Sequence, residues 1–408
     1  MPGRNLTDGS SSVCGRFRSS ALAMACSGKN ILDNSAPSRV WWEAMSWVER
    51  RYSKGQIDKA GQALIALPKD DPGREEAIAI VDNWRSCHSY PLQVIKMTLL
   101  QRAKRIYPLA LVAQRLKRRP SIEIKLRDNP NMKLSQMQDI GGCRAVLRNL
   151  AEVRKLVATY KSYHLKSPKN RSSWDGSDDF DYIKNPKPDG YRSIHLIFRF
   201  QSPSPERSVF NGQRIEIQIR SKLQHAWATA VETAQVFTGQ ALKSKFKNAS
   251  EDWLRFFELT SSAFAAREKA PFVPGTPDNR QDIIAELQAI VQREPIMQSL
   301  TKWNDTIHRL EPVGPGMHSF LLVLNPTELT LRVGAYTKDQ LDAAQQAYER
   351  EEKANENDPN VQVVLVAVED IAALRKAYPN YYVDTKEFIR VVQRELSEHF
   401  VDKLLASA

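Results

Sequence analysis

The fold is decided by residues 193–220, which read SIHLIFRFQSPSPERSVFNGQRIEIQIR. The two ends of this stretch, Ser193–Phe200 and Arg214–Arg220, alternate apolar and polar residues with a period of two. Half-buried β-strands show this alternation because successive side chains point to opposite faces of a sheet. In the second strand Glu216 and Gln218 share one face. The stretch therefore predicts two strands, the second of which presents a polar face.

Helical patterns surround these two strands. Upstream, apolar residues recur at helical spacing from Asp58, from Glu75 to about Trp84, and from Pro91 to about Gln114. Further helices are expected at Ala151–Lys161, Leu223–Phe237, Ala249–Arg267 and about 280–292. Asp139-Ile-Gly-Gly-Cys-Arg-Ala-Val-Leu-Arg predicts a turn that runs into a buried strand. The pattern indicates an α+β fold.

The last part of the chain is set apart by two Pro- and Gly-rich stretches, residues 271–277 and 311–316, which predict linkers. A compact β/α pattern follows. Its strands are expected at Phe320–Leu324, Leu329–Ala335 and Val361–Val368, and its helices at 338–356, 370–377 and 384–405. We divide the chain into a flexible extension at 1–38, a main domain at 39–270, a linker and connecting helix at 271–315, and a small domain at 316–408.

Composition narrows the class of protein. The 408 residues carry a formal net charge of +12, which favours polyanionic partners such as nucleotides or RNA, although simple solubility is the plainer explanation. No run of about 18 apolar residues predicts a membrane span, so we expect a cytoplasmic protein without a membrane partner. The four cysteines are scattered and form no CxxC pair, which favours a reducing compartment and predicts no zinc site.

A basic stretch supplies the first candidate chemistry. Residues 102–133 hold ten Lys or Arg against two acidic residues, a net charge of +8. Within it, Arg115, Lys117, Ser121 and Lys125 place four cationic or polar groups along one short segment. A nucleoside triphosphate needs several cations, and an arginine can also stack on adenine. The alternative is a solvated basic helix face.

Two acidic residues supply the second. Asp139 precedes the Gly-Gly turn, and Glu216 lies on the polar face of a strand. Two carboxylates beside a basic patch suit Mg²⁺, which in proteins binds one or two carboxylates together with substrate phosphates. The alternative is that Glu216 pairs with a neighbouring arginine on the sheet.

The third candidate is a loop that precedes a strand, DYIKNPKPDGYRSIH at residues 181–195. Tyr191 stands at the junction of loop and strand, where its ring can stack on a base. Lys184, Lys187, Arg192 and His195 can meet phosphate. By itself the stretch could equally be an ordinary Pro/Gly loop.

Taken together, these segments resemble the synthetase domain of the RelA/SpoT alarmone enzymes. The ordered motifs are RLKRRPSIEIKL, MQDIGGCRAVL, DYIKNPKPDGYRSIH and RIEIQIRSKLQHAWA, and the resemblance covers roughly residues 85–240. It implies a mixed β-sheet flanked by helices, of nucleotidyltransferase type, and an ATP-dependent pyrophosphokinase that uses Mg²⁺. One departure is Cys143, where the family usually has an aliphatic residue.

The resemblance also implies roles for individual residues. Arg115, Lys117, Ser121 and Lys125 would hold ATP, and Arg144 and Arg148 would assist them. The catalytic set would be Asp139 and Glu216, which would also bind the metal, with Gln218 beside them. The acceptor would be bound by Tyr191, His195, Lys184 and Lys187.

Within the family, the chain looks most like CapRel-type proteins, which fuse the synthetase to a pseudo-zinc-finger antitoxin domain with a YxxY motif. Here Tyr378-Pro-Asn-Tyr381 supplies YxxY in the small C-terminal domain. This resemblance implies that both rings block the ATP site until a phage capsid protein binds. The alternative is that Tyr378 and Tyr381 are ordinary half-buried tyrosines.

The same resemblance implies a toxin of phage defence that pyrophosphorylates the 3′-CCA end of the tRNA acceptor stem and stops translation. The expected tRNA contacts are Arg102, Lys104, Arg105, Arg118 and Arg119, because phosphate contacts dominate RNA binding. Two alternatives stay open: a small alarmone synthetase that makes ppGpp or ppApp from a nucleotide acceptor, and a catalytically idle nucleotide- or RNA-binding regulator.

Overall fold

The structure is a computed structural model. It describes residues 47–166, 172–174, 180–238, 251–306, 308–310, 316–355 and 361–367, single positions between 358 and 382, and 384–407. These residues belong to one compact unit, Trp47–Ala408. The expected flexible extension at 1–38 and most of the expected short helix at 370–377 lie outside the described residues.

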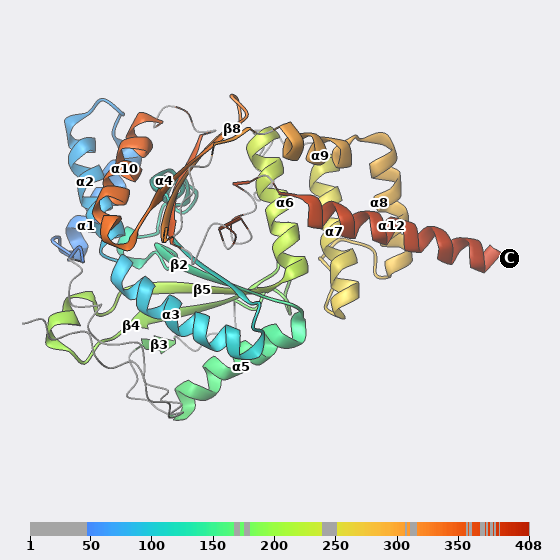
Figure 1. The fold of residues 1–408 in the computed structure, drawn as a ribbon, viewed down its shortest axis with the longest axis horizontal. Coiled ribbons are helices and arrows are strands. Elements are labelled where there is room, and N and C mark those ends of the chain that lie inside the picture. Colours follow the sequence, from blue (N-terminus) through green and yellow to red (C-terminus); the bar gives the residue numbers. More distant parts are fainter. Residues whose placement is uncertain are drawn as a thin grey trace, which may run out of the picture. The chain divides into compact units, whose positions relative to one another are not determined.

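A mixed sheet organises the described chain, in the strand order β3-β4-β5-β2-β1-β9-β7-β8-β6 (Figure 1). The strands are β1 (Leu111–Leu116), β2 (Gly141–Leu147), β3 (Ser172–Trp174), β4 (Ile194–Phe200), β5 (Arg214–Ser221), β6 (His308–Leu310), β7 (Ser319–Asn325), β8 (Thr330–Tyr336) and β9 (Gln362–Ala367). β2 pairs with β5, and β6 with β8, in parallel; the other pairs are antiparallel. The expected α+β fold with a mixed sheet is confirmed.

The helices pack on this sheet and beside it. They are α1 (Lys54–Ala66), α2 (Pro72–Ser86), α3 (Ser89–Ile106), α4 (Arg119–Asp128), α5 (Leu150–Lys166), α6 (Lys222–Thr238), α7 (Glu251–Glu268), α8 (Arg280–Arg293), α9 (Ile296–Thr306), α10 (Leu341–Ala354) and α12 (Lys386–Ser407). α3 and α5 cover one face of β2, β5 and β4, where their apolar side chains form a common core with those of the strands (Figure 1). No described helix is both long and apolar enough to cross a membrane.

Local signals explain where several helices begin and end. α1 starts after Ser53, which forms a capping box with Gln56. α2 starts after Asp71, whose carboxylate accepts a hydrogen bond from the Gly73 N–H at 2.7 Å. The helix expected from Pro91 to about Gln114 is wrong in its last third: α3 ends at Ile106, because Pro108 cannot continue it. Residues 111–116 form β1 instead.

The period-two pattern of β5 is confirmed in detail. Ile215, Ile217 and Ile219 are fully buried, while Glu216 and Gln218 lie on the opposite face and are half-buried. Because β5 lies between β4 and β2, its polar face is held at the middle of the sheet. The strand thus fixes the direction of the two polar side chains.

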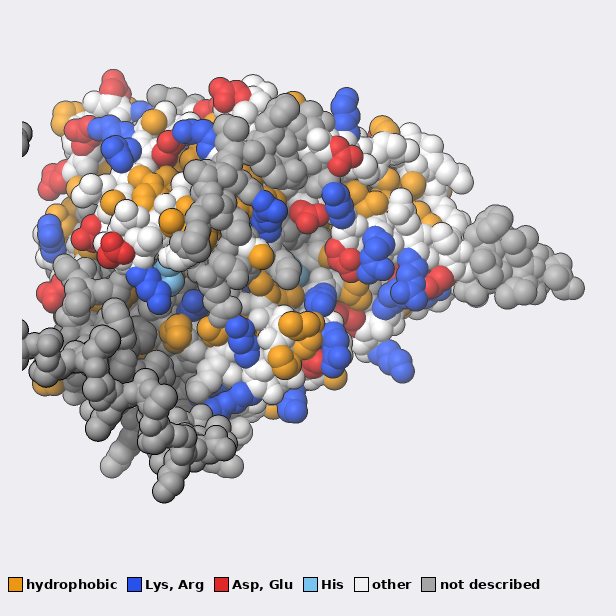
Figure 2. Space-filling model, in the orientation of Figure 1, with side chains coloured by type: hydrophobic (Ala, Val, Ile, Leu, Met, Phe, Trp, Pro, Cys, Tyr) orange, Lys and Arg blue, Asp and Glu red, His pale blue; other side chains and the backbone are white. Residues whose placement is uncertain are grey.

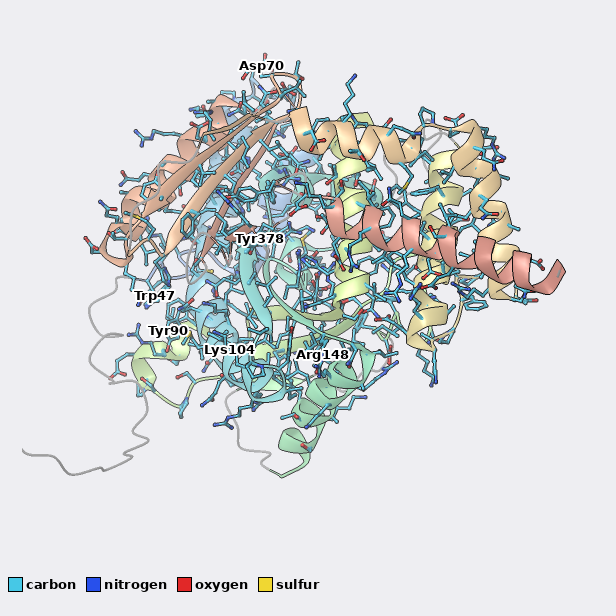
Figure 3. The ribbon with its side chains drawn as sticks, turned by 45° about the vertical axis from the view of Figure 1, so that its right-hand side comes forward. Trp47, Asp70, Tyr90, Lys104, Arg148 and Tyr378 are labelled. Atoms are coloured by element: carbon cyan, nitrogen blue, oxygen red, sulfur yellow. The ribbon has the colours of Figure 1, made fainter. Side chains whose placement is uncertain are left out.

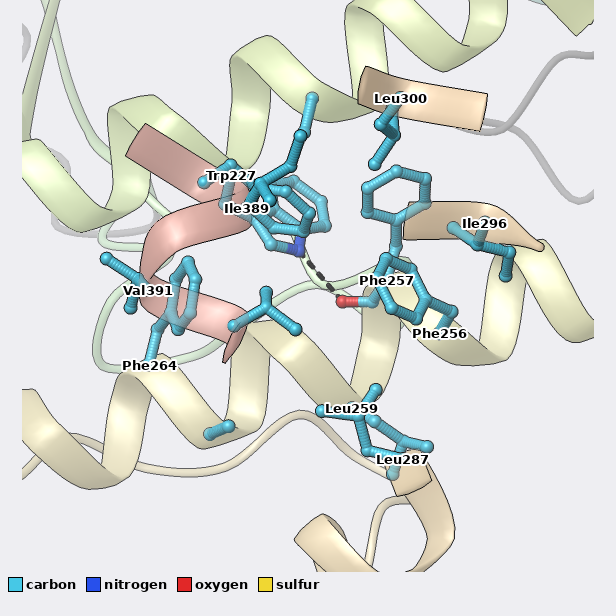
Figure 4. Close-up of a cluster of buried hydrophobic side chains, with 14 of the residues drawn as sticks. Trp227, Phe256, Phe257, Leu259, Phe264, Leu287, Ile296, Leu300, Ile389 and Val391 are labelled. Carbon is cyan, nitrogen blue, oxygen red and sulfur yellow. Dashed lines mark hydrogen bonds between the residues drawn. The ribbon is translucent and has the colours of Figure 1, made fainter. Parts of the chain in front are cut away.

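A second core joins helices from distant parts of the sequence. α6, α7, α8 and α12 gather apolar side chains into one cluster, part of which is drawn in Figure 4. The indole of Trp227 donates to the Phe257 carbonyl at 2.8 Å, and the Phe388 ring of α12 lies 5.8 Å from that of Phe257. Packing therefore crosses the expected domain boundaries at 270 and 315, which stay predictions.

The C-terminal strands extend the main sheet. β9 pairs with β1 through Gln114 opposite Ala367 and Arg115 opposite Val366, and β7 lies on the other side of β9. The β/α pattern expected at 316–408 is thus present as β7, β8, α10 and β9, edge to edge with the main domain. We call Ser319–Ala367 the C-terminal sheet region.

Candidate active site

A cavity near the centre of the sheet collects seven of the candidate site residues that the sequence predicted. It measures about 50 Å³ and lies over β1, β2 and β5. Its lining residues are Ala113, Arg115, Lys117, Asp139, Gly142, Cys143, Arg144, Glu216, Gln218 and Tyr378. Strand register explains the gathering: Arg115 lies opposite Gly142, and Gly142 opposite Glu216. A Cβ added at Gly142 would meet only the Arg115 carbonyl oxygen, at 3.9 Å, so the strand is not crowded at this position.

Asp139 is held by two lysines. Its two oxygens accept from Lys117 Nζ at 2.8 Å and from Lys125 Nζ at 2.9 Å. Burial alone raises the pKa of this carboxyl. The two ammonium groups lower it by a larger amount, so the net pKa lies well below its usual value. Burial also lowers the pKa of Lys117. The predicted ATP-binding lysines and the predicted metal ligand therefore form one charged cluster.

Glu216 heads a chain of hydrogen bonds. Its carboxylate contacts His195 Nδ1 at 2.9 Å and accepts from Gln218 Nε2 at 2.7 Å. His195 Nε2 lies 2.9 Å from the hydroxyl of Tyr191. Burial alone lowers the pKa of His195, but the Tyr191 and Glu216 oxygens raise it to about 9. At neutral pH the imidazole is thus charged and faces the carboxylate.

His195 also shifts the pKa values of its two partners, Glu216 and Tyr191. Burial raises the pKa of the Glu216 carboxyl, yet His195 lowers it by more, and the net pKa lies below the usual value. Burial likewise raises the pKa of Tyr191, whereas His195 and Arg220 lower it to about 8. The expected catalytic carboxylate and two of the four expected acceptor residues, Tyr191 and His195, therefore share one network.

Tyr378 closes the cavity from the C-terminal side. Its hydroxyl donates to the Gln114 carbonyl of β1 at 2.6 Å, and the Arg144 guanidinium lies 5.9 Å from its ring centre. Tyr378 and Tyr381 are both fully buried, and their ring centres are 6.3 Å apart. In the tilted view of Figure 3, Tyr378 lies near the middle of the molecule, where the C-terminal strands meet the main domain.

The two tyrosines influence the pKa values of the cavity arginines, Arg115 and Arg144. Burial lowers the pKa of Arg115, but Tyr381, Glu232 and Tyr378 raise it, and the net pKa lies above its usual value. Burial and the neighbouring Arg220 lower the pKa of Arg144 to about 10. Buried guanidinium groups beside an enclosed space can take up a polyanion.

The sequence analysis missed Glu232, whose charge acts on both Arg115 and Arg144. It lies on α6, whereas the two arginines lie on β1 and β2. No local pattern marks such a residue, because the three elements are neighbours only in the folded chain.

The other expected ligands of ATP and of the acceptor are not part of the cavity lining. Ser121 is half-buried in α4, one turn before Lys125, so both residues can face the same side. Arg148 is mostly exposed and pairs with Glu152 at 2.6 Å. Lys187 Nζ lies 4.4 Å from the ring centre of Tyr182, and Lys184 is exposed.

Arg192, which the sequence offered for phosphate contact, lies elsewhere. Its side chain is 3% exposed, its Nε donates to Ser261 Oγ at 3.0 Å, and Nη2 donates to the Pro271 carbonyl. It fastens the Tyr191 loop to α7 instead of facing a ligand.

The expected tRNA contacts differ in exposure. Arg105 is exposed and Lys104 half-buried, while the Arg102 guanidinium stacks 4.3 Å from the Tyr160 ring centre. Arg118 is half-buried. Arg119 is 6% exposed and pairs with Asp82 at 3.3 Å, so in this conformation it does not face solvent. On the face shown in Figure 2, Lys and Arg side chains are spread widely among acidic ones.

Comparison with known proteins identifies the domain that holds this cavity. Residues 114–238 match the region found in RelA / SpoT proteins. The chain carries a RelA/SpoT synthetase domain. It is an ATP-dependent pyrophosphotransferase. The matched RelA/SpoT region runs from β1 to α6 and includes Arg115, Asp139 and Glu216, whereas Tyr378 lies outside it.

Individual relatives extend the comparison. The chain is 29% identical over 165 residues to the GTP pyrophosphokinase YjbM of Bacillus subtilis (strain 168), across 38% of this chain and 71% of that protein. It is similar to the structure of small alarmone synthetase 2 from Bacillus subtilis, with 18% identity, a TM-score of 0.36, and coverage of 46% and 93% of the two chains. It is also similar to the structure of a GTP pyrophosphokinase family protein from Streptococcus pneumoniae, with 20% identity and a TM-score of 0.35. This comparison covers 44% of this chain and 85% of that chain.

Proposed function

We propose that the RelA/SpoT domain transfers the β,γ-pyrophosphate of ATP to a 3′-hydroxyl in the cavity over β1, β2 and β5. The observation that carries this proposal is the convergence of Asp139 and Glu216 with Arg115, Lys117 and Arg144 on that cavity. Phosphoryl-group transfer depends on positioning and on neutralising charge, and this set of side chains supplies both.

In the proposed reaction, the 3′-hydroxyl oxygen attacks the β-phosphorus in line, and AMP leaves with the electrons of the broken P–O bond. Glu216 takes the hydroxyl proton, and Gln218, at 2.7 Å, orients its carboxylate. Tyr191 leaves the hydroxyl contact with His195 to stack on the acceptor base. Lys117 and Lys125, which now neutralise Asp139, turn to the phosphates of ATP.

The donor set fits Mg²⁺. Asp139 and Glu216 line one cavity, and Mg²⁺ in proteins typically takes one or two carboxylates together with phosphate oxygens and water. These two carboxylates would hold the ion, which would supply charge neutralisation for the transferred group. Among the described residues, no group of three or more His, Cys, Asp and Glu side chains could hold a metal ion.

For the acceptor, we propose the 3′-CCA end of tRNA. The supporting feature is the net charge of +8 over residues 102–133, because phosphate contacts dominate RNA binding. Arg105 is exposed to such a partner at one end of α3, beside Lys104, which is labelled in Figure 3. The second candidate acceptor is a guanine nucleotide, which the GTP pyrophosphokinase named among the relatives favours.

We further propose that the C-terminal sheet region and Tyr378 keep the enzyme inactive. Pockets that enclose small molecules measure about 300–1,000 Å³, far more than the 50 Å³ left beside Tyr378. We therefore propose that the ring of Tyr378 must leave before ATP binds in this cavity. Expression of Tyr378→Ala or Tyr381→Ala should stop growth in cells without phage; healthy growth with protein visibly made counts against the block.

The trigger that we propose is a phage capsid protein that binds the expected small domain at residues 316–408. The chain would then be a fused toxin and antitoxin of phage defence. The support is the placement of Tyr378 on a part of the chain outside the RelA/SpoT match. Co-expression with capsid protein should arrest growth in the wild type and not in Glu216→Gln. Continued growth of the wild type would reject this trigger.

The acceptor is tested with γ-³²P-ATP and the Tyr378→Ala chain. Incubation with tRNA or with GDP, GTP and adenine nucleotides, followed by gel and thin-layer analysis, should place the label on tRNA. Label on nucleotides alone would replace tRNA by the alarmone alternative. Absence of transfer to either acceptor would contradict the proposed reaction and favour an idle binding protein.

A further inference from the structure

A second contact joins the C-terminal sheet region to the synthetase domain, away from Tyr378. α10 follows β8 and lies beside α2, so that orange and blue helices are neighbours in Figure 1. Tyr348 and Glu352 on α10 are both buried, at 5% and 7% exposed. Both reach Arg85 on α2, which is 3% exposed. Charged groups rarely occur so deep in an interface unless they are paired.

Arg85 is the hub of this contact. Its Nη1 donates to Asp82 at 2.6 Å and to Glu352 at 3.1 Å, and Nη2 donates to the hydroxyl of Tyr348. The Tyr348 hydroxyl in turn donates to Glu352 Oε1 at 2.6 Å. The Nε of Arg85 donates to the backbone carbonyl of Lys117 at 2.9 Å. One guanidinium therefore links α10 to the segment that carries a cavity lysine.

Glu352 also caps the helix that carries the predicted ATP ligands Ser121 and Lys125. Its Oε1 accepts from the backbone N–H of Arg119, the first residue of α4, at 3.1 Å. The preceding residue, Arg118, makes no capping bond with its side chain within the described structure. A carboxylate at a helix N-terminus satisfies an open N–H and matches the helix dipole. A residue 233 positions away thus replaces the local cap.

We propose that Tyr348 and Glu352 form a latch, which holds the C-terminal sheet region closed on the synthetase domain through Arg85 and the N-terminus of α4, independently of Tyr378. This inference rests on the proposed inhibition by the C-terminal region and adds the contact that maintains it. When the latch opens, β9 can leave β1, and Tyr378 loses its acceptor, the Gln114 carbonyl.

The charges explain why the latch is strong and specific. Burial alone raises the pKa of Glu352, but Arg85, the Tyr348 hydroxyl and Arg119 together lower it by more, so the carboxyl stays ionised. Removal of one partner from a buried ion pair leaves the other charged and without compensation, which is strongly unfavourable. A second ion pair across the same two helices, Lys353 with Glu75, is 4.0 Å long with both side chains more than three-quarters exposed. Exposed pairs contribute little.

The test compares full-length Glu352→Gln with the matched control Lys353→Ala. Glutamine keeps the size of the side chain and an oxygen for the Arg119 N–H, and removes the charge that faces Arg85. We expect amide hydrogen exchange of α10 and β9 to rise tenfold or more in Glu352→Gln and to stay at the wild-type rate in Lys353→Ala. Exchange in α7, which belongs to the other core, should not change. Tyr348→Phe removes one hydroxyl and should also raise the amide hydrogen exchange of α10 and β9, by a smaller factor than Glu352→Gln.

If α10 and β9 of Glu352→Gln exchange their amide hydrogens at the wild-type rate, the proposed latch is wrong. So would a rise in α7 in both Glu352→Gln and Tyr348→Phe, because general unfolding would then explain the effect. Transfer from γ-³²P-ATP separates this failure from that of the proposed function: with faster exchange, activity should also rise tenfold or more. Faster exchange while Glu352→Gln and Tyr378→Ala both stay inactive would reject the proposed function and leave the latch standing.

Discussion

Two regions of this molecule bury carboxylates against cations, and they do so in different ways. In the cavity, Asp139 is 20% exposed and is held by Lys117 and Lys125, which are 19% and 31% exposed. In the α10 contact, Glu352 is 7% exposed and is held by a guanidinium that is 3% exposed. Ammonium groups on flexible stems can turn to another anion, whereas a buried guanidinium with several fixed hydrogen bonds cannot do so easily.

The difference separates a site from a support. In the cavity the charges are satisfied within the chain, and we propose that the lysines turn from Asp139 to phosphate when a polyphosphate binds. The α10 contact holds charges that only a movement of the helix would separate. The RelA/SpoT match, residues 114–238, covers the first region, whereas Arg85 and Glu352 of the second lie outside it. We therefore expect loss of activity from changes in the cavity and gain of activity from changes in the C-terminal contacts.

The largest expected effect is a loss in the cavity. Glu216→Gln should lower pyrophosphate transfer about 10³-fold in a Tyr378→Ala background, because the base that receives the hydroxyl proton is removed. Label transfer from γ-³²P-ATP measures it. Glu206→Gln, at an exposed position before β5, is the matched control and should keep full activity. Equal rates in both variants would show that Glu216 has no catalytic part.

An intermediate effect is expected at the ring that closes the cavity. Tyr378→Phe keeps the ring and removes the hydroxyl that donates to the Gln114 carbonyl. A neutral hydrogen bond contributes about 1 kcal/mol, so basal activity should rise about threefold to tenfold. Initial rates of transfer without a trigger measure this rise. A rate that equals that of Tyr378→Ala would assign the whole closure to the hydroxyl and none to the ring.

The smallest expected effect concerns stability and pH. The lysines hold the pKa of Asp139 below its usual value of about 3.9, so the ion pairs stabilise the fold at neutral pH and lose this effect as acid protonates Asp139. Lys125→Gln should lower the free energy of unfolding by ~1 kcal/mol at pH 7, and by less as the pH falls below 4. Urea denaturation at several pH values measures it, with exposed Lys59→Gln as the control. A deficit that stays constant with pH would exclude the pair as its cause.

Much of the cavity could be predicted from the sequence because its residues lie in short patterns. The alternation of β5 places Glu216 and Gln218 together, and the spacing of Lys117 and Lys125 brings both to Asp139. The end of α3 was missed because apolar spacing continues past Pro108 into β1, where a strand with similar composition begins.

The contacts between the two regions could not be predicted from local patterns. β9 pairs with β1 across some 250 positions, and either strand could have found other partners. Glu352 belongs to a run of acidic and basic residues on α10, Glu349–Lys353, and such a run is typical of a solvated helix face. Its burial depends on Arg85 and on the open N-terminus of α4, which meet it only after the chain has folded.

The most direct test of the central claim, that the C-terminal region closes an ATP site, is the affinity of the full-length chain for a non-hydrolysable ATP analogue. Isothermal titration should compare wild type with Tyr378→Ala. We predict that Tyr378→Ala binds with a Kd at least tenfold lower than that of the wild type, because the ring no longer fills the cavity beside Arg115 and Arg144. Equal affinities in the two chains would contradict the account.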